Sequence, residues 1–173
     1  MRFRSGLLAA CAAAALALSV GVTSAKTLRY ANQGDLKSLD PYTLNETTAN
    51  AHLGNVYEGL TKRGKDLAIQ PGLAERWEVS PDRKEITFHL HKGAKFPSGN
   101  PVTAEDVAWS LHRVVKLNFG NAATLTEFGF TKDNVEQSIV AGDNTVTFKL
   151  DKPYPTTLVL QSIGANRVSM VMD

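Results

Sequence analysis

The stretch that decides the fold is TFHLHKGAKFPSGNPVTAEDVAWSLHRVVK, residues 87–116. Phe88 and Leu90 at its start, together with Ile86 just before it, alternate with polar residues, a spacing typical of a strand with one buried face. Thr103 is a candidate helix N-cap, and Asp106 stands three residues later, where a capping box places its acidic residue. Apolar residues then recur at helical spacing, namely Ala104, Val107, Ala108, Leu111, Val114 and Val115. A one-sided strand followed by an amphipathic helix predicts a mixed α/β (α+β) domain.

Two hairpins are expected on either side of this helix. The first joins residues 77–79 to residues 85–91 through the turn sequence Ser80-Pro81-Asp82. The second spans residues 135–150 and turns at Gly142-Asp143-Asn144. The return strand of each hairpin has a similar sequence, residues 147–152 and 87–92, as expected of two similar amphipathic hairpins.

Further elements are expected nearer the two ends. Alternation predicts a strand over residues 27–32, and residues 73–77 form either one helical turn or an extended lead-in to the first hairpin. Apolar spacing predicts a helix from residue 47 to residue 60, and a second one over residues 156–163. The stripe of the first helix consists of Ala49, Leu53, Val56, Tyr57 and Leu60. Asn45 or Thr47 is expected to cap its start and Gly59 to end it.

Residues 1–25 have the order of a cleaved export signal. Arg2 and Arg4 give a positive start, residues 6–22 carry no charge, and small residues lead up to Ala25. We therefore expect cleavage after Ala25 and a periplasmic location. A transmembrane anchor is the alternative, but the apolar run is short and rich in alanine for a hydrocarbon layer about 30 Å thick.

Removal of that segment changes the charge and the cysteine content. The chain has 19 basic and 17 acidic residues, and the segment holds two of the basic residues and no acidic one, so the mature chain is expected to be neutral. That balance gives no reason to expect a nucleic-acid partner. Cys11 is the single cysteine, so the mature chain would hold no disulfide and no thiol nucleophile. A lipid-modified Cys11 is a further alternative, which the continuation of the apolar run beyond it disfavours.

Candidate reactive side chains are few. His89 and His91 stand two residues apart on one strand face and could jointly bind a metal ion, but the spacing supplies no third ligand. A solvent-facing strand edge is the favoured interpretation of this pair. Trp77 and Trp109 are expected to be core residues. The sequence has no glycine-rich phosphate loop and no nucleophile elbow, so we expect no catalytic residue, no metal and no cofactor.

Five blocks of the chain carry a resemblance through their order. They are SLDP at 38–41, VYEGL at 56–60, PGLAERW at 71–77, TFHLHKGAKF at 87–96 and PVTAEDV at 101–107. In this order they resemble the N-terminal part of the family 5 bacterial extracellular solute-binding proteins, the dipeptide- and oligopeptide-binding components of ABC importers. The resemblance covers residues 26 to about 152, and the rest more loosely.

The resemblance implies a periplasmic binding protein-like class II fold, in which two lobes close on a ligand around a hinge. Members of this family are much longer than this chain. Residues 26–173 are therefore expected to be an N-terminal fragment that holds only part of lobe one and its subdomain, with the subdomain at about residues 98–173. Such a fragment is expected to bind ligand weakly by itself.

The resemblance also implies where a ligand would bind. In peptide-binding relatives, backbone just after the Leu-Asp-Pro turn pairs with an extended ligand, and the matching residues are Leu44, Asn45, Glu46 and Thr47. Asn45, Glu46 and Thr47 are therefore the candidate ligand-binding residues. In a competing interpretation, these residues only cap the helix that begins near Thr47.

The implied function is periplasmic capture of a peptide or a similar small solute for an ABC importer. The implied partners are that ligand and the permease subunits, and the protein is expected to be a monomer. The ligand itself stays open, because related members carry nickel complexes, haem, opines or oligosaccharides. Two other classes of protein are alternatives: an exported enzyme whose catalytic site is completed downstream, and a stand-alone interaction domain.

Overall fold

The computed structural model describes residues 27–29, 31, 34–43, 46–165 and 167–173. It divides the chain into two compact units, Met1–Gln33 and Gly34–Asp173. All of the described helices and strands lie in the second unit. The export signal expected over residues 1–25 lies outside the described residues.

The strand expected over residues 27–32 is wrong where it can be examined. Residues 27–29 and Ala31 are described and belong to no strand. Alternation of apolar and polar residues favours a strand only where a neighbouring strand completes the backbone hydrogen bonds, and neither sheet of the second unit includes these residues.

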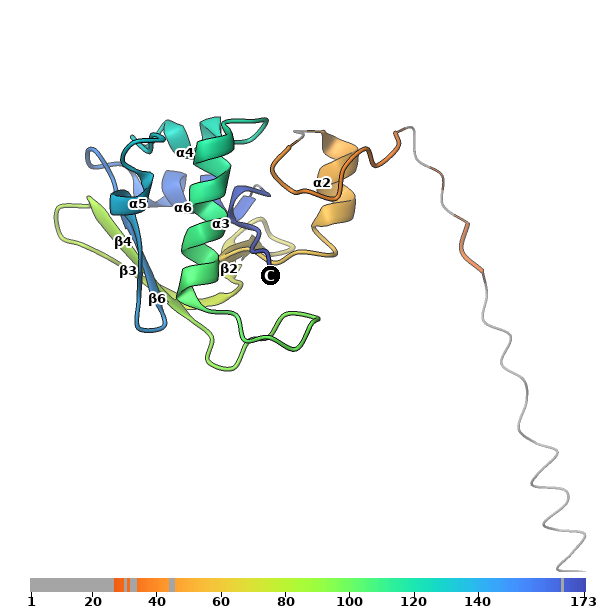
Figure 1. Ribbon diagram of the computed structural model, residues 1–173, viewed down its shortest axis with the longest axis horizontal. Coiled ribbons are helices and arrows are strands. Elements are labelled where there is room, and N and C mark those ends of the chain that lie inside the picture. Colours follow the sequence, from red (N-terminus) through yellow and green to blue (C-terminus); the bar gives the residue numbers. More distant parts are fainter. Residues whose placement is uncertain (1–26, 30, 32–33, 44–45, 166) are drawn as a thin grey trace, which may run out of the picture. The chain divides into compact units, whose positions relative to one another are not determined.

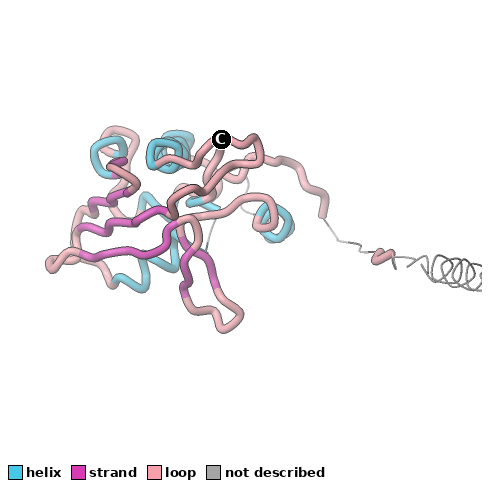
Figure 2. The backbone as a smooth tube through the Cα atoms, turned by 90° about the horizontal axis from the view of Figure 1, so that it is seen from below, coloured by secondary structure: helices cyan, strands magenta, loops and turns pink. Residues whose placement is uncertain are grey.

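The centre of the second unit is a four-stranded antiparallel sheet in the order β3-β4-β6-β5 (Figure 1). Its strands are β3 (Ala74–Val79), β4 (Glu85–Leu90), β5 (Ile139–Gly142) and β6 (Thr145–Lys149). The strands lie side by side in Figure 2 as well. Where the two hairpins meet, Ile86 lies opposite Phe148 and Phe88 opposite Val146. Both hairpins therefore place their apolar side chains on one buried face, as the alternation predicts.

The long helix α3 (Ala104–Leu117) packs on β5 and β6. Its start is a capping box: the backbone N–H of Asp106 donates to Thr103 Oγ1 over 3.2 Å, and the backbone N–H of Thr103 donates to Asp106 Oδ2 over 2.8 Å. The six residues of the predicted stripe are all buried, so this helix is confirmed. Trp109 falls outside the stripe and is 54% exposed, so the expectation that it is a core residue is wrong.

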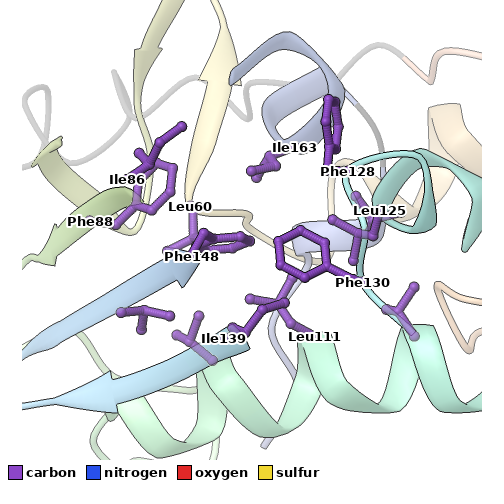
Figure 3. Packing of buried hydrophobic residues seen from close by; sticks show 14 of the residues in the cluster. Leu60, Ile86, Phe88, Leu111, Leu125, Phe128, Phe130, Ile139, Phe148 and Ile163 are labelled. Carbon is purple, nitrogen blue, oxygen red and sulfur yellow. The ribbon is translucent and has the colours of Figure 1, made fainter. Parts of the chain in front are cut away.

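The core lies between the sheet, α3 and the later helices, which are α4 (Ala123–Thr126), α5 (Val135–Ser138), α6 (Thr156–Ala165) and the 3₁₀ turn η1 (Arg167–Ser169). Figure 3 shows how three phenylalanines meet there. Phe148 contacts Phe88 and Phe130 edge-on, with ring centroids 5.3 and 5.9 Å apart. Trp77 is half-buried against Phe88, so its predicted core role is confirmed in part.

The ends of three elements differ from the sequence prediction. β3 begins at Ala74, which makes residues 73–77 the extended lead-in rather than a helical turn. Residues 135–138 form α5 instead of the start of the second hairpin. Reciprocal hydrogen bonds between Thr131 and Asn134 begin that turn, and the N–H of Ser138 continues it by donating to the carbonyl of Asn134. The predicted helix over 156–163 is confirmed as α6.

The helix expected over residues 47–60 is only half as long. The structure has α2 (Thr47–Leu53) there, and Leu53 and Ala49 are buried while Val56 is 67% exposed. The side-chain amide of Asn55 donates to the carbonyl of Ala51 over 2.7 Å, which satisfies one of the last free carbonyls of the helix. The apolar spacing beyond Leu53 is therefore coincidental.

Thr47 and Gly59 do not cap α2 as expected, and Asn45 lies outside the described residues. Its N-cap is Glu46, whose side chain makes no capping hydrogen bond, and Thr47 is the first helical residue. Gly59 does not end the helix. A Cβ atom on Gly59 would lie 2.4 Å from Ser169 Oγ, so glycine is required there because two segments approach closely.

A second, two-stranded sheet was not predicted. It pairs β1 (Thr61–Arg63) with β2 (Ile69–Pro71), and Leu67 adopts a positive φ of 64° in the turn that joins them. α6 packs against this hairpin. Within the part of the chain that the structure describes, no helix combines the length and the apolar character that a membrane crossing requires.

Candidate ligand-binding site

The Ser38-Leu39-Asp40-Pro41 turn is organised by the side chain and backbone of Asp40. The N–H of Tyr42 donates to Asp40 Oδ1 over 2.9 Å, and Thr43 Oγ1 donates to the Asp40 carbonyl over 3.2 Å. Ser38 Oγ accepts a hydrogen bond from the N–H of Asp40 over 3.1 Å. These short-range bonds are typical of Asp and Ser in turns, and they order the turn at residues 38–43.

Arg113 of α3 attaches this turn to the body of the protein. Its guanidinium donates to both carboxylate oxygens of Asp40, over 3.1 and 2.5 Å, and its Cζ lies 5.3 Å from the centroid of the Tyr42 ring. Partial burial raises the pKa of Asp40, but the hydrogen bonds from Arg113 and from the Tyr42 N–H outweigh it, so the pKa lies below its usual value. A bidentate pair of this kind fixes orientation as well as distance.

Tyr42 makes the second attachment. It is buried, and its hydroxyl donates to the carbonyl of Met170, just beyond η1. Burial raises the pKa of this hydroxyl, so Tyr42 stays protonated and able to donate. Met170 in turn packs against Ala49 and Leu53 of α2. The turn at residues 38–43 is thus held between α3 and the chain that follows α6.

The predicted ligand-binding residues follow directly on this attached turn. Glu46 is half-buried and its Oε1 lies 3.2 Å from Lys37 Nζ, while Thr47 is exposed at the start of α2. Asn45 lies outside the described residues. The structure places Glu46 and Thr47 at the start of α2, which follows the turn that Asp40 and Tyr42 hold.

His89 of β4 and His91, which follows the strand, do not meet in one site. His89 lies 3.3 Å from Glu78 Oε1 and 3.2 Å from Arg76 Nη2, whereas His91, one residue past the strand, lies 3.8 Å from Glu75. Among the described residues, no group of three His, Cys, Asp or Glu side chains is arranged to hold a metal ion.

Sequence reasoning missed the roles of Arg113 and Tyr42. Arg113 lies near the C-terminal end of α3, and its partner Asp40 is 73 positions away. No local spacing could reveal that contact. The burial of Tyr42 likewise depends on contacts with residues far away in the chain, such as Met170.

The fold and this site define a class of protein. Residues 68–170 match the middle region of the bacterial extracellular solute-binding proteins, family 5, and this match covers more than half of the chain. The chain belongs to that family, which consists of extracellular or periplasmic solute-binding proteins and not of enzymes.

Individual relatives agree with the family. The chain is 33% identical to the periplasmic oligopeptide-binding protein OppA of Escherichia coli over 169 residues, covering 87% of this chain and 31% of that protein. It is 38% identical to the dipeptide-binding protein DppE of Bacillus subtilis over 90 residues, covering 52% of this chain and 17% of that protein. The chain thus spans less than a third of the length of these relatives.

A solved structure shows the same fold. Haemophilus influenzae OppA in complex with RPPGFSPFR superimposes with a TM-score of 0.69 at 27% identity, covering 79% of this chain and 28% of that one. The expected fold class, a mixed α/β arrangement that is part of a periplasmic binding protein, is confirmed.

Proposed function

We propose that the protein captures a peptide or a similar small solute outside the cytoplasm and delivers it to the permease subunits of an ABC importer, acting as a monomer and without chemical change to the solute. Family membership is the observation that carries this proposal. The relatives named as dipeptide- and oligopeptide-binding proteins favour a peptide over the other solutes.

Export through a signal removed after Ala25 belongs to the same proposal, since a solute-binding protein of this family works outside the cytoplasm. The division of residues 26–173 into part of lobe one and a subdomain at about 98–173 also stays a proposal. Intact-mass analysis of the exported protein tests the first point. A mature chain that begins at Lys26 supports it, and one that begins at a lipid-modified Cys11 would contradict it.

Within this function, Asn45, Glu46 and Thr47 contact the ligand mainly through backbone groups. Three features support this assignment. Glu46 is half-buried and Thr47 is exposed, both follow closely on the turn that the Asp40 and Tyr42 contacts hold, and the backbone of Glu46 is extended. The backbone of an extended residue can pair with an extended peptide, and Glu46 has φ −116° and ψ 140°.

Two substitutions at one position separate a backbone role from a side-chain role. Glu46→Pro removes the N–H donor, and Glu46→Gln keeps the N–H and the side-chain length but removes the charge. In the gene product that contains this chain, titrated calorimetrically with tri- to pentapeptides, Glu46→Pro should weaken binding roughly tenfold or more, and Glu46→Gln should bind like the wild type. Unchanged affinity in a folded Glu46→Pro variant would remove this segment from the site. Equal losses in both variants would assign the contact to the carboxylate.

A further inference from the structure

Residues 46–58 form an excursion from the main core, which packs between the four-stranded sheet and the helices. Tyr42 before them and Leu60 after them are almost completely buried and belong to that core. Of residues 46–58 themselves, only Ala49 and Leu53 are buried, and neither contributes to the main core. Figure 1 shows α2 on the side of α3 that faces away from the four-stranded sheet. We call residues 46–58 the α2 flap.

The apolar side chains of the α2 flap form a small cluster of their own. Ala49 and Leu53 pack against Met170, and the half-buried Tyr57 packs against these three. The main core instead joins residues from both hairpins, α3 and α6. Because stability follows the apolar surface that is buried, the flap is bound to the protein less strongly than the core elements are bound to one another.

Helix α2 adds little stability by itself. It has seven residues, and its N-cap, Glu46, makes no side-chain capping hydrogen bond, whereas α3 has fourteen residues and a capping box. A helix as short as α2 is marginal in water unless tertiary packing supports it. α2 therefore depends on the small cluster around Leu53.

The end of the α2 flap runs along two cavities, of about 570 and 480 Å³. Val56, Tyr57 and Glu58 line both of them, so this part of the flap has open space beside it instead of closely packed side chains. The N–H of Val171 donates to the carbonyl of Glu58 over 3.1 Å, and the chain rejoins the body of the protein at that point.

Polar contacts also hold the α2 flap against the protein. Lys37 Nζ lies 3.2 Å from Glu46 Oε1, and the Tyr57 hydroxyl donates to the Leu39 carbonyl over 3.2 Å. Burial lowers the pKa of Arg167 and the charge of Glu46 raises it, so these two side chains attract each other. The contacts favour the closed flap, but an exposed ion pair contributes little to stability.

We propose that the α2 flap opens locally, with Tyr42 and Leu60 as its fixed ends, while the main core stays folded. The closed flap is the predominant state, and opening breaks the contacts of the small cluster. Glu46 and Thr47 move with the flap. The consequence for binding rests on the proposed function: a peptide that contacts these two residues only when the flap is closed holds it closed.

Amide hydrogen exchange of the gene product that contains this chain, measured without ligand by mass spectrometry, tests the flap. The N–H groups of residues 50–54, which donate within α2, should exchange roughly tenfold or more faster than those in the middle of α3. Leu111→Ala removes a fully buried side chain of the main core and should speed exchange in α3 roughly tenfold or more, without changing the rate in α2. Leu53→Ala is the matched change in the flap and should speed exchange in α2 roughly tenfold or more.

Equal rates in α2 and α3 of the wild type would overturn the proposal, because the two helices would then open only together. Equal acceleration of both by Leu111→Ala would overturn it for the same reason, and an unchanged α2 rate in Leu53→Ala would contradict the role of the small cluster. If Leu111→Ala does not fold, dilute urea replaces it. Urea should speed exchange in α3 more steeply than in α2, because opening of the core exposes more surface, and equal slopes would contradict the flap.

A bound peptide tests the link to binding. With a tri- to pentapeptide that calorimetry shows to bind, exchange in α2 should slow by the same factor as exchange in α3, about a hundredfold at a free concentration about 100 times Kd. Slowing in α3 alone would mean that the peptide stays bound when the flap opens, which contradicts the link. If no peptide binds, the proposed function fails, and the exchange without ligand still decides whether the flap exists.

Discussion

Arg113, in the third turn of α3, donates to both carboxylate oxygens of Asp40, which lies 73 positions earlier in the chain. The pair joins the turn ahead of the proposed ligand segment to the most regular helix of the protein. A binding segment that acts through its backbone must be held in one conformation before the ligand arrives, because ordering it during binding would weaken affinity. The Asp40–Arg113 pair orders the turn that precedes the proposed segment.

Replacing Arg113 should therefore affect stability. Arg113→Met keeps much of the side-chain length but leaves a half-buried carboxylate without its partner, and the free energy of unfolding should fall by about 2 kcal/mol. Urea unfolding followed by circular dichroism measures it. Lys116→Met, which breaks the exposed pair with Glu136 on the same helix, is the matched control and should leave the midpoint close to that of the wild type. Equal effects of the two substitutions would show that the Asp40 contact is no stronger than a surface pair.

The same pair predicts how stability depends on pH. Because the pKa of Asp40 is lower in the folded state than in the unfolded chain, its contribution is present above the unfolded value of about 4 and is lost as the pH falls through the folded value. Unfolding curves between about pH 6 and pH 2 should show a smaller loss of stability in Asp40→Asn than in the wild type. Arg113→Met should flatten the profile in the same way, and an unaltered profile in both variants would contradict this origin of the acid sensitivity.

Replacing the threonine at the start of a helix should lower stability more at α3 than at α2. Thr103→Ala removes the capping box of α3 and should lower the free energy of unfolding by about 1 kcal/mol. Thr47→Ala removes no capping hydrogen bond, because Glu46 is the N-cap of α2, and should change stability by less than about 0.5 kcal/mol. Thermal melts of the two variants make the comparison. A larger loss in Thr47→Ala would restore the capping interpretation of that segment.

Close packing at Gly59 gives a further test. Gly59→Ala would place a Cβ atom 2.4 Å from Ser169 Oγ, so stability should fall by roughly 1–3 kcal/mol. Adding Ser169→Ala removes the nearest atom, although it also removes the hydrogen bond from Ser169 to the Ile163 carbonyl. The double variant should then lose less than the sum of the two single losses, as a double-mutant cycle measures. Simple additivity would mean that the two residues do not contact each other.

Local patterns in the sequence predict helices and strands correctly where no distant contact competes with them. The capping box at Thr103 and the alternation at Ile86, Phe88 and Leu90 are local, and the elements they predict are present. The stripe continued past Leu53 because Val56, Tyr57 and Leu60 happen to keep helical spacing, while the chain there turns to meet Ser169 and Glu58 accepts from the N–H of Val171. That competition is tertiary, and periodicity does not contain it.

In the candidate site, too, local features could be predicted from the sequence and contacts between distant residues could not. The resemblance carried by SLDP placed the ligand segment next to a turn, and the turn is present with Asp40 at its centre. Arg113, Tyr42 and Arg167 acquire their surroundings only when α3 and η1 fold against that turn and against α2. A sequence does not distinguish a buried arginine from an exposed one, because burial depends on contacts between residues far apart in the chain.

Native mass spectrometry of the gene product with a set of tri- to pentapeptides tests the central claim, that this is a protein that captures solutes without changing them. We predict a complex of one protein with one intact peptide, with the peptide recovered unaltered after denaturation. Failure to bind any peptide would contradict the peptide assignment, and recovery of shortened peptides would contradict capture without catalysis.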